Sequence, residues 1–339
     1  MSERILLTRL RYIGDVVLTT PCIRVLRDSF PKAEITYLTQ APYGEILENN
    51  PFLTRVLSID FASLGTVGAM RLLWQLRRSS YDLAVDLFSN PRSALLTAST
   101  GARKRVGTYH FWRSWAYNVN VRVPPAVRSA VEHHLEHLRS VGLEASFSPP
   151  EVFVTKEETE EGDRLMRASG IAEPSKTILL QPGAKWHAKR WPVKRFGELA
   201  ELLRREAFPV AFVAGPGEET NVIESKVRVP DAPVVSGLTL RQLVKVLSAA
   251  AAYVGNDGGP AHLAAGLKKP MVAVFGPSEP DIWFPYPGDG RSSCVWEEVE
   301  CRPCHLHFCE HVNCLQSVSA RRVFWRLMEL LEVGGPARE

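Results

Sequence analysis

The residues with the clearest chemical potential form the run Gly255-Asn-Asp-Gly-Gly-Pro-Ala-His262. Residues 251–254 before it have the pattern of a short buried strand, and residues 260–266 that of a small-residue helix. A strand that turns through paired glycines into a helix leaves backbone amides without intrahelical partners, at the positive end of the helix dipole. The turn therefore indicates an anion site, with an ordinary capped connection as the alternative. Its candidate binding residues are Asp257, Gly258, Gly259 and His262.

A second candidate follows the first predicted strand, in the segment Tyr12-Ile-Gly-Asp15. Gly14 permits a tight turn, and Asp15 stands just before a helix predicted over residues 16–30. A carboxylate at this position can cap the helix. It can equally act as a general base that takes a proton from an attacking hydroxyl. The residue types leave both roles open.

A basic loop over residues 181–192 precedes another predicted helix. Gly183 and Ala184 expose backbone amides, and Lys189 is one of three basic side chains that follow. Such a loop suits a diphosphate, because amides bind the oxygens and a lysine neutralises the charge on a leaving group. The alternative is a solvated basic loop, which the two tryptophans flanking the charges disfavour.

The run Gly215-Pro-Gly-Glu-Glu219 is a further strand-to-helix turn. An acidic side chain there can bind the hydroxyls of a ribose, as in nucleotide-binding folds. Alternatively, both glutamates complement the dipole of the helix that follows.

These turns belong to two successive blocks of alternating strands and helices, which predict an α/β fold with two doubly wound parallel sheets. Ligands of such sheets bind at the carboxyl ends of the strands. A length of 339 residues also favours two domains. Neither block has Gly-x-Gly-x-x-Gly after its first strand, and no Gly-Lys-Ser/Thr loop is present, which disfavours dinucleotide oxidoreductases and nucleotide hydrolases. The predicted strands span residues 4–8, 34–39, 55–59, 81–86, 103–106, 177–180, 210–214, 233–235, 251–254 and 271–275, and the predicted helices residues 16–30, 42–48, 67–78, 91–100, 130–141, 157–169, 193–205, 218–227, 240–250, 260–267 and 320–331.

Composition and charge indicate a globular protein that binds an acidic partner. Hydrophobic residues make up 45% and charged residues 23%, and no apolar run approaches the ~20 residues that span a bilayer. The first residues do not resemble a signal peptide, so we expect a cytoplasmic protein. Residues 1–150 hold 18 Lys and Arg against 12 Asp and Glu, whereas residues 151–339 hold 23 against 25. The basic first half favours a phosphorylated lipid, an anionic sugar or nucleic acid, unless the excess is ordinary solvated charge.

Four cysteines cluster near the C-terminus, with histidines between them. Their spacing is compatible with zinc or an iron–sulfur cluster. A cytosolic location disfavours obligatory disulfides. We expect a structural loop rather than a metal site here. The residues are Cys301, Cys304, Cys309 and Cys314.

Taken together and in order, the motifs resemble one family. They are Gly14-Asp15, Gln181-Pro-Gly-Ala184 with Ala188-Lys-Arg-Trp-Pro192, Gly215-Pro-Gly-Glu-Glu219, and Gly255-Asn-Asp-Gly-Gly-Pro-Ala-His262 with Phe275-Gly-Pro277. From Ile5 to about Val323, the chain resembles the bacterial lipopolysaccharide heptosyltransferases of glycosyltransferase family 9. The resemblance implies a GT-B fold of two Rossmann-like domains facing a central cleft. It also implies inverting transfer of heptose from ADP-heptose to the inner core of lipopolysaccharide. The sequence contains no Asp-x-Asp metal site, so we expect no metal or other cofactor, with a lysine and helix termini in place of a divalent ion.

The resemblance also implies roles for individual residues. Asp15 matches the general base, Lys189 the lysine that neutralises the donor diphosphate, and Glu219 the acid at the ribose. The donor-binding loop would contain Asp257, Gly259 and His262, and Gly183 and Ala184 would contribute amides. Many relatives have Ser or Thr where this chain has Gly258, so the backbone amide would serve in place of a hydroxyl.

The implied domains are residues 1–170, which bind the acceptor, and residues 171–319, which bind the nucleotide sugar. Residues 320–339 would form a helix that packs back on the first domain. Arg11 and Arg92 are candidates for binding a lipid A–Kdo or heptosylated core acceptor. Trp112 and Trp115 are candidates for contact with the inner-membrane surface, to which the enzyme would bind peripherally from the cytoplasm. The alternative for each of these residues is an ordinary surface or packing role.

Other functions remain open at this stage. The donor can be another nucleotide sugar, the acceptor another molecule, or the protein a nucleotide-sugar epimerase on the same architecture. Epimerisation would require a second titratable group at the sugar, for which His262 is the nearby candidate. A binding module without catalysis would keep the phosphate loops and tolerate loss of Asp15. Nucleic acid is not an expected partner.

Overall fold

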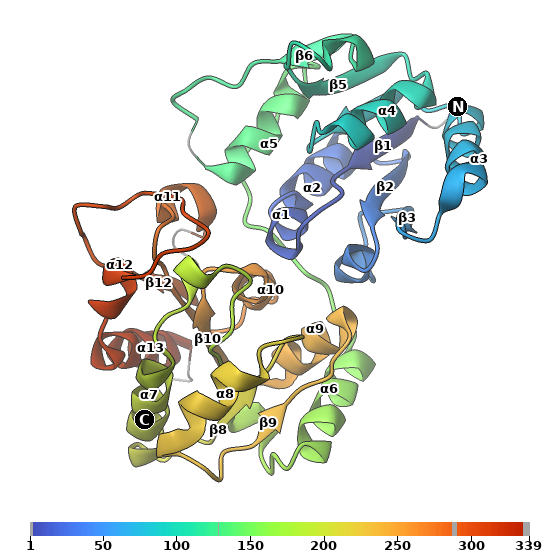
Figure 1. Cartoon of the computed structure of the whole chain (residues 1–339). Coiled ribbons are helices and arrows are strands. Elements are labelled where there is room, and N and C mark those ends of the chain that lie inside the picture. Colours follow the sequence, from blue (N-terminus) through green and yellow to red (C-terminus); the bar gives the residue numbers. More distant parts are fainter. Residues whose placement is uncertain (1–2, 128, 287–289, 335–339) are drawn as a thin grey trace. The chain divides into compact units, whose positions relative to one another are not determined.

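The computed structural model describes residues 3–127, 129–286 and 290–334, and the chain divides into two compact units, Met1–Phe153 and Val154–Glu339 (Figure 1). Each unit contains, in its described residues, a parallel six-stranded sheet flanked by helices. The strand orders are β3-β2-β1-β4-β5-β6 and β12-β11-β10-β7-β8-β9. Both are doubly wound, with the order reversing at β1/β4 and at β7/β10. The predicted fold class is therefore confirmed.

In the first unit, apolar runs form strands that are buried on both faces, as parallel sheets require. Ile5, Leu6 and Leu7 of β1, for example, are fully buried. The strands are β1 (Arg4–Thr8), β2 (Glu34–Gln40), β3 (Arg55–Ile59), β4 (Leu83–Asp86), β5 (Lys104–Thr108) and β6 (Val119–Val121). The helices are α1 (Ile13–Val17), α2 (Thr20–Ser29), α3 (Gly65–Arg78), α4 (Pro91–Thr100) and α5 (Ala130–Arg139), with 3-10 turns η1 (Tyr43–Leu47) and η2 (Ser114–Ala116).

The helix predicted over residues 16–30 is two helices, α1 and α2. Pro21 occupies the second position of α2, where a missing amide hydrogen costs nothing, and so favours a new helix start there. Asp15 consequently lies inside the first turn of α1, not ahead of the helix. The short strand β6 was not predicted, because Asn120 interrupts its three residues.

The second unit has a hydrophobic core between the sheet and helices α7 and α13. Its strands are β7 (Ile178–Gln181), β8 (Val210–Val213), β9 (Val234–Val235), β10 (Ala252–Asn256), β11 (Met271–Val274) and β12 (Ser292–Val295). Its helices are α6 (Lys156–Ala168), α7 (Val193–Arg205), α8 (Glu219–Ser225), α9 (Leu240–Ala249), α10 (Gly259–Gly266), α11 (Pro280–Trp283), α12 (Asn313–Gln316) and α13 (Ala320–Gly334), with 3-10 turns η3 (Pro174–Lys176), η4 (His187–Lys189) and η5 (Lys226–Arg228). Strand β12 and helices α11 and α12 were not predicted.

The division of the structure differs from the predicted domain boundary. The division lies after Phe153, not after residue 170, because α6 packs along α9 of the second unit. Helix α13 packs on α7, β11 and β12 of the second unit. Its packing on the first domain stays a prediction. Its Val323 and Leu327 are fully buried in the core of the second unit. Among the described residues, no helix is both long and apolar enough to cross a bilayer.

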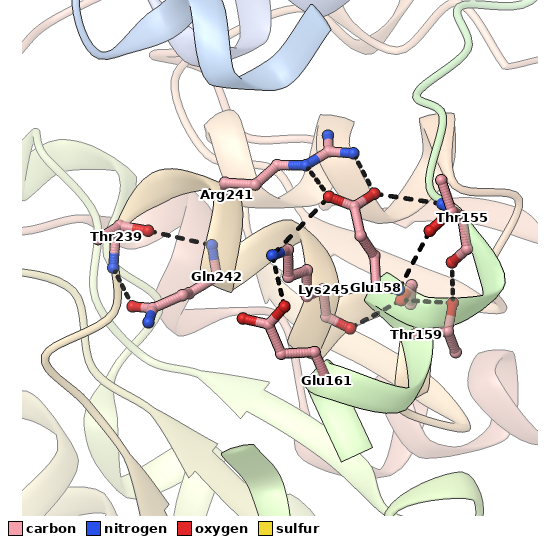
Figure 2. Close-up of polar contacts among 9 residues, drawn as sticks. Thr155, Glu158, Thr159, Glu161, Thr239, Arg241, Gln242 and Lys245 are labelled. Carbon is pink, nitrogen blue, oxygen red and sulfur yellow. Dashed lines mark hydrogen bonds and ion pairs between the residues drawn. The ribbon is translucent and has the colours of Figure 1, made fainter. Parts of the chain in front are cut away.

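The α6–α9 interface combines close backbone approach with buried charge (Figure 2). Figure 2 shows the Arg241 guanidinium facing both carboxylate oxygens of Glu158, with N···O distances of 2.8 and 2.5 Å. Lys245 donates to Glu161 at 2.8 Å. Arg241 is 5% exposed, so its pairing with Glu158 offsets the cost of burying both charges. Glu158 also completes the capping box of α6 with Thr155.

Gly162 lets the two helices approach. A Cβ there would lie 2.1 Å from the carbonyl oxygen of Lys245, a rigid backbone atom on α9. We expect Gly162→Ala to destabilise the protein by about 1–3 kcal/mol, because the helices must separate. Gly68→Ala is the matched control: it is also a mid-helix glycine, but its neighbour is the movable Leu64 side chain. The control should be neutral or gain up to about 1 kcal/mol from helix propensity. Thermal unfolding compares the two, and equal melting temperatures would contradict the close-approach role of Gly162.

Candidate active site

Lys189 and Asp257 meet at the carboxyl edge of the second sheet. The Lys189 Nζ donates to Asp257 Oδ2 at 2.5 Å, and the Ser278 hydroxyl donates to the same oxygen. Lys189 closes the turn η4, Asp257 directly follows β10, and Ser278 lies beyond β11. Asp257 is 4% exposed, so the ammonium is held by a carboxylate that solvent hardly reaches. Two residues that the sequence assigned to the donor are thus brought together.

Asn256, the last residue of β10, fixes the loop that carries Lys189. Its side-chain amide donates to the carbonyls of Pro182 and Gly183, both at 3.0 Å, and its Oδ1 accepts from the Trp191 amide at 2.9 Å. Trp191 is fully buried, and its indole donates to the Val318 carbonyl at 3.0 Å. Both ends of the basic loop are therefore tied to the sheet. The sequence reasoning assigned no role to Asn256, although it stands directly before the donor-binding candidate Asp257.

We call the carboxyl edge of the second sheet, with its loops, the second half-site. There the Glu218 side chain, rather than that of Glu219, contacts the neighbouring loops. Its Oε2 accepts from the Gly215 amide at 2.9 Å and from the Gln181 side chain at 3.1 Å. A Cβ at Gly183 would lie 1.9 Å from the Glu218 carboxyl carbon, so a larger residue there would displace this side chain. Glu219 begins α8 and is exposed. Its contact with a ribose stays a prediction.

Helix α10 presents its N-terminus beside Asp257. Gly258 caps it with φ −171°, an extended conformation open to any residue. A Cβ there would come no closer than 3.8 Å to another atom, so the backbone does not require glycine at this departure from the family. Gly259 is the first helical residue. His262 of the same helix is buried, with Nδ1 3.0 Å from the Tyr286 hydroxyl. In the basic loop, the carbonyl of the predicted residue Ala184 accepts a hydrogen bond from the Arg190 side chain at 2.8 Å.

Asp15 in the first unit performs the capping role and has a second partner. Its Oδ2 accepts from the Tyr12 amide at 3.2 Å, which satisfies an N-terminal donor of α1. Its Oδ1 accepts from Arg9 Nη2 at 2.5 Å. The carboxylate side chain remains 18% exposed and can therefore still meet a ligand hydroxyl. Sequence reasoning had not paired Arg9 with Asp15.

Arg9 is itself held by the ends of two strands. Its Nε donates to the Arg11 carbonyl and its Nη1 to the Leu87 carbonyl, both at 2.8 Å, while Phe88 lies under the guanidinium at 4.5 Å. The loop after β4 that supplies Leu87 and Phe88 is set by Asp86. This buried carboxylate accepts from the Phe88 and Ser89 amides and from the Tyr117 hydroxyl at 2.7–3.0 Å. Burial raises the pKa of Asp86.

Burial and the positive charge of Arg9 lower the pKa of three histidines of α5. The sequence reasoning did not identify these histidines. Burial lowers the pKa of His133, His134 and His137, and the Arg9 guanidinium lowers each further. The pKa of His137 falls to about 4, and its Nε2 lies 2.9 Å from the Thr108 hydroxyl. The imidazoles are therefore neutral at pH 7. The available signal was three histidines within five residues of a predicted amphipathic helix.

The side chains of the two acceptor candidates, Arg11 and Arg92, have other partners. Arg11 donates to the Gln40 side chain at 3.0 Å, and the exposed Arg92 at the start of α4 stacks over Phe61. Their contact with an acceptor stays a prediction.

The cysteine cluster shows no metal-binding arrangement. Among the described residues, no three or more His, Cys, Asp or Glu side chains are grouped to hold an ion. The thiols of all four cysteines are free. Burial raises the pKa of Cys314, and the thiols of Cys301, Cys304 and Cys309 raise it further. The expected absence of a metal stays a prediction.

A sequence profile of glycosyltransferase family 9 (heptosyltransferase) matches residues 69–313. The chain belongs to glycosyltransferase family 9. It is 25% identical over 289 residues to lipopolysaccharide heptosyltransferase 3 of Escherichia coli K12, covering 82% of this chain and 83% of that protein. Membership of this family makes the protein a glycosyltransferase.

Solved structures of the family agree with the fold. A glycosyl transferase family 9 protein of Veillonella parvula superposes with a TM-score of 0.83 at 24% identity, covering 98% of both chains. ADP-heptose lipopolysaccharide heptosyltransferase II of E. coli superposes with a TM-score of 0.82 at 23% identity, covering 98% of this chain and 99% of that one. The likeness confirms the GT-B fold class of the family 9 chain.

The lowered pKa of His137 predicts loss of stability in acid. The unfolded group titrates near 6.5 and the folded one near 4, so its contribution is complete above pH 6.5 and lost as the pH falls toward 4. Between pH 7.5 and 5 this amounts to about 2 kcal/mol. His137→Gln should reduce by that amount the difference in unfolding free energy between the two pH values, measured by urea denaturation. Replacement of the exposed His311 by Gln should leave the difference unchanged. Equal acid sensitivity in wild type and His137→Gln would show that this imidazole is not buried in its neutral form.

Proposed function

We propose that this glycosyltransferase transfers a heptose from ADP-heptose to the inner core of lipopolysaccharide, with inversion at the anomeric carbon. Membership of family 9 and the similarity to lipopolysaccharide heptosyltransferase 3 support the sugar and the acceptor class. The observation that carries the proposal is the Lys189–Asp257 pair at the N-terminus of α10. It provides a positioned cation beside helix amides, which is what a departing nucleoside diphosphate requires.

On the donor side, we assign Lys189 to the oxygens of the leaving ADP. An ammonium has three hydrogens, so Lys189 can donate to a phosphate while keeping its bond to Asp257. The main role of Asp257 in this scheme is to orient the Lys189 side chain. Both observed contacts use Oδ2, and we assign Oδ1 to a sugar hydroxyl. The lysine and the amides of α10 take the place of a metal ion in this scheme, so we propose no cofactor.

On the acceptor side, we assign Asp15 as the general base. The acceptor oxygen forms a bond to the anomeric carbon as the bond to the ADP oxygen breaks, and the hydroxyl proton passes to Asp15. Arg9 holds Oδ1 at 2.5 Å and so fixes the orientation of the carboxylate. We propose that the reaction takes place at the cytoplasmic surface of the inner membrane, where Arg11 and Arg92 meet the anionic acceptor.

Replacement of the base tests the reaction type. Asp15→Asn should lower the rate of heptose transfer by a factor of about 10²–10⁴, because the hydroxyl loses its proton acceptor. The amide keeps an oxygen for the Tyr12 amide, and ADP affinity measured by calorimetry should stay within about twofold, since the donor contacts lie in the second unit. Unchanged transfer by this variant would remove Asp15 from the mechanism. Normal ADP binding without any transfer by the wild type would instead indicate a different donor sugar or acceptor.

Replacement of the lysine tests the donor half-site. Lys189→Ala should weaken ADP binding by about tenfold or more, because a charge-assisted hydrogen bond is lost. Lys185→Ala, in the same loop but exposed, is the matched control and should bind ADP like the wild type. In thermal-shift measurements ADP should stabilise the wild type more than UDP or GDP. A stronger effect of UDP would point to another nucleotide sugar, and equal ADP affinity of the two lysine variants would contradict the role of Lys189.

A further inference from the structure

Helix α3 exposes an apolar face to solvent. Leu72 and Leu76 bury its inner side in the core of the first unit. On the outer side, Val67, Met70 and Trp74 are 66%, 60% and 59% exposed. Their spacing of three and four residues places them on one face of the helix. Large apolar side chains aligned in this way mark an interaction site more often than single exposed residues do.

The segment after β5 adds exposed aromatic rings. Phe111, Trp112 and Trp115 are 71%, 76% and 63% exposed. The segment is anchored on α4, where Ala116 packs with Ala94, and α4 in turn packs beside α3. The two groups of exposed side chains therefore border neighbouring elements of the same unit. We call Val67, Met70, Trp74, Phe111, Trp112 and Trp115 the aromatic surface.

Basic residues outnumber acidic ones around the aromatic surface. Residues 61–127 contain nine Lys and Arg but only Asp82 and Asp86 as acids. Asp86 is fully buried, whereas Asp82 is exposed and accepts a hydrogen bond from the Arg4 amide. The exposed Asp60 lies just before this segment. Neither α3 nor residues 109–116 contain an acidic side chain, whereas α3 alone has three arginines. One of them, Arg78, stacks over Trp74 with 4.5 Å from its guanidinium carbon to the ring centroid.

We propose that the aromatic surface binds an anionic lipid bilayer. Tryptophan and phenylalanine rings enter the boundary between head groups and acyl chains, and neighbouring arginines bind the anionic head groups. The position of the surface fits this partner, because α3 and residues 109–116 both begin at the carboxyl edge of the first sheet, where Asp15 lies. The choice of a bilayer rests on the proposed function in one respect, because the proposed acceptor is anchored in a lipid bilayer. A membrane bound at the aromatic surface would keep such an acceptor near Asp15.

Vesicle flotation tests the proposal with the full chain and with neither donor nor acceptor present. The probes are phosphatidylcholine vesicles with and without about one-third phosphatidylglycerol. The wild type should float with the anionic vesicles, less so as salt is raised, and poorly with the neutral ones. Trp74→Ser/Trp112→Ser should lower the fraction bound at least tenfold. Because the vesicles contain no sugar acceptor, failure of heptose transfer would leave this result untouched.

The matched control is Trp325→Ser, which removes a tryptophan of similar exposure, 61%, from α13 of the second unit. It should float like the wild type, and both variants should keep the wild-type melting temperature and thermal shift with ADP. Equal flotation of the double variant and the wild type would overturn the proposal. So would a dimer in sedimentation velocity that the double variant loses, since the partner would then be a second copy. Binding of single-stranded RNA without binding of vesicles would also overturn it.

Discussion

The second half-site depends on the hydrogen bonds of one side chain, the Asn256 amide. It contacts the loop after β7 at Pro182 and Gly183 and the segment before α7 at Trp191. Asparagine can do this because its amide donates twice and accepts on the same planar group. An aspartate of the same shape would face two carbonyl oxygens with a negative charge. These hydrogen bonds at the end of β10 position the loop that carries Lys189, and therefore the Lys189–Asp257 pair.

The first unit uses arginine for the same purpose. Arg9 follows β1 and links the loop after β4 to Asp15, as Asn256 links two loops to β10. In each unit the linking residue lies beside the point at which the strand order reverses. Loops diverge to opposite sides there, which opens space for a ligand but leaves their ends unsupported. A polar side chain at the strand end supplies the missing support.

The sequence was sufficient to locate most of the strands along the chain, because runs such as residues 178–180 and 271–274 are apolar and bounded by turns. It was less informative where neighbours along the chain are chemically equivalent. Glu218 and Glu219 differ only in which one points back to Gly215, and that depends on where α8 starts. Contacts between distant segments, such as Arg241 with Glu158, decided the domain boundary and had no local signal. The roles assigned to Asp15 and Lys189 rest on family resemblance and stay predictions, since their geometry shows partners but not chemistry.

The position of α13 has a consequence for the evolution of the protein. Because this last helix packs on the second unit, the described chain passes from one unit to the other once, at Phe153–Val154. A single genetic crossover near that point would join the first unit of one relative to the second unit of another without cutting a sheet or a core. Recombination of this kind exchanges one half-site while the other is inherited unchanged. A family built in this way can diversify its two ligands independently.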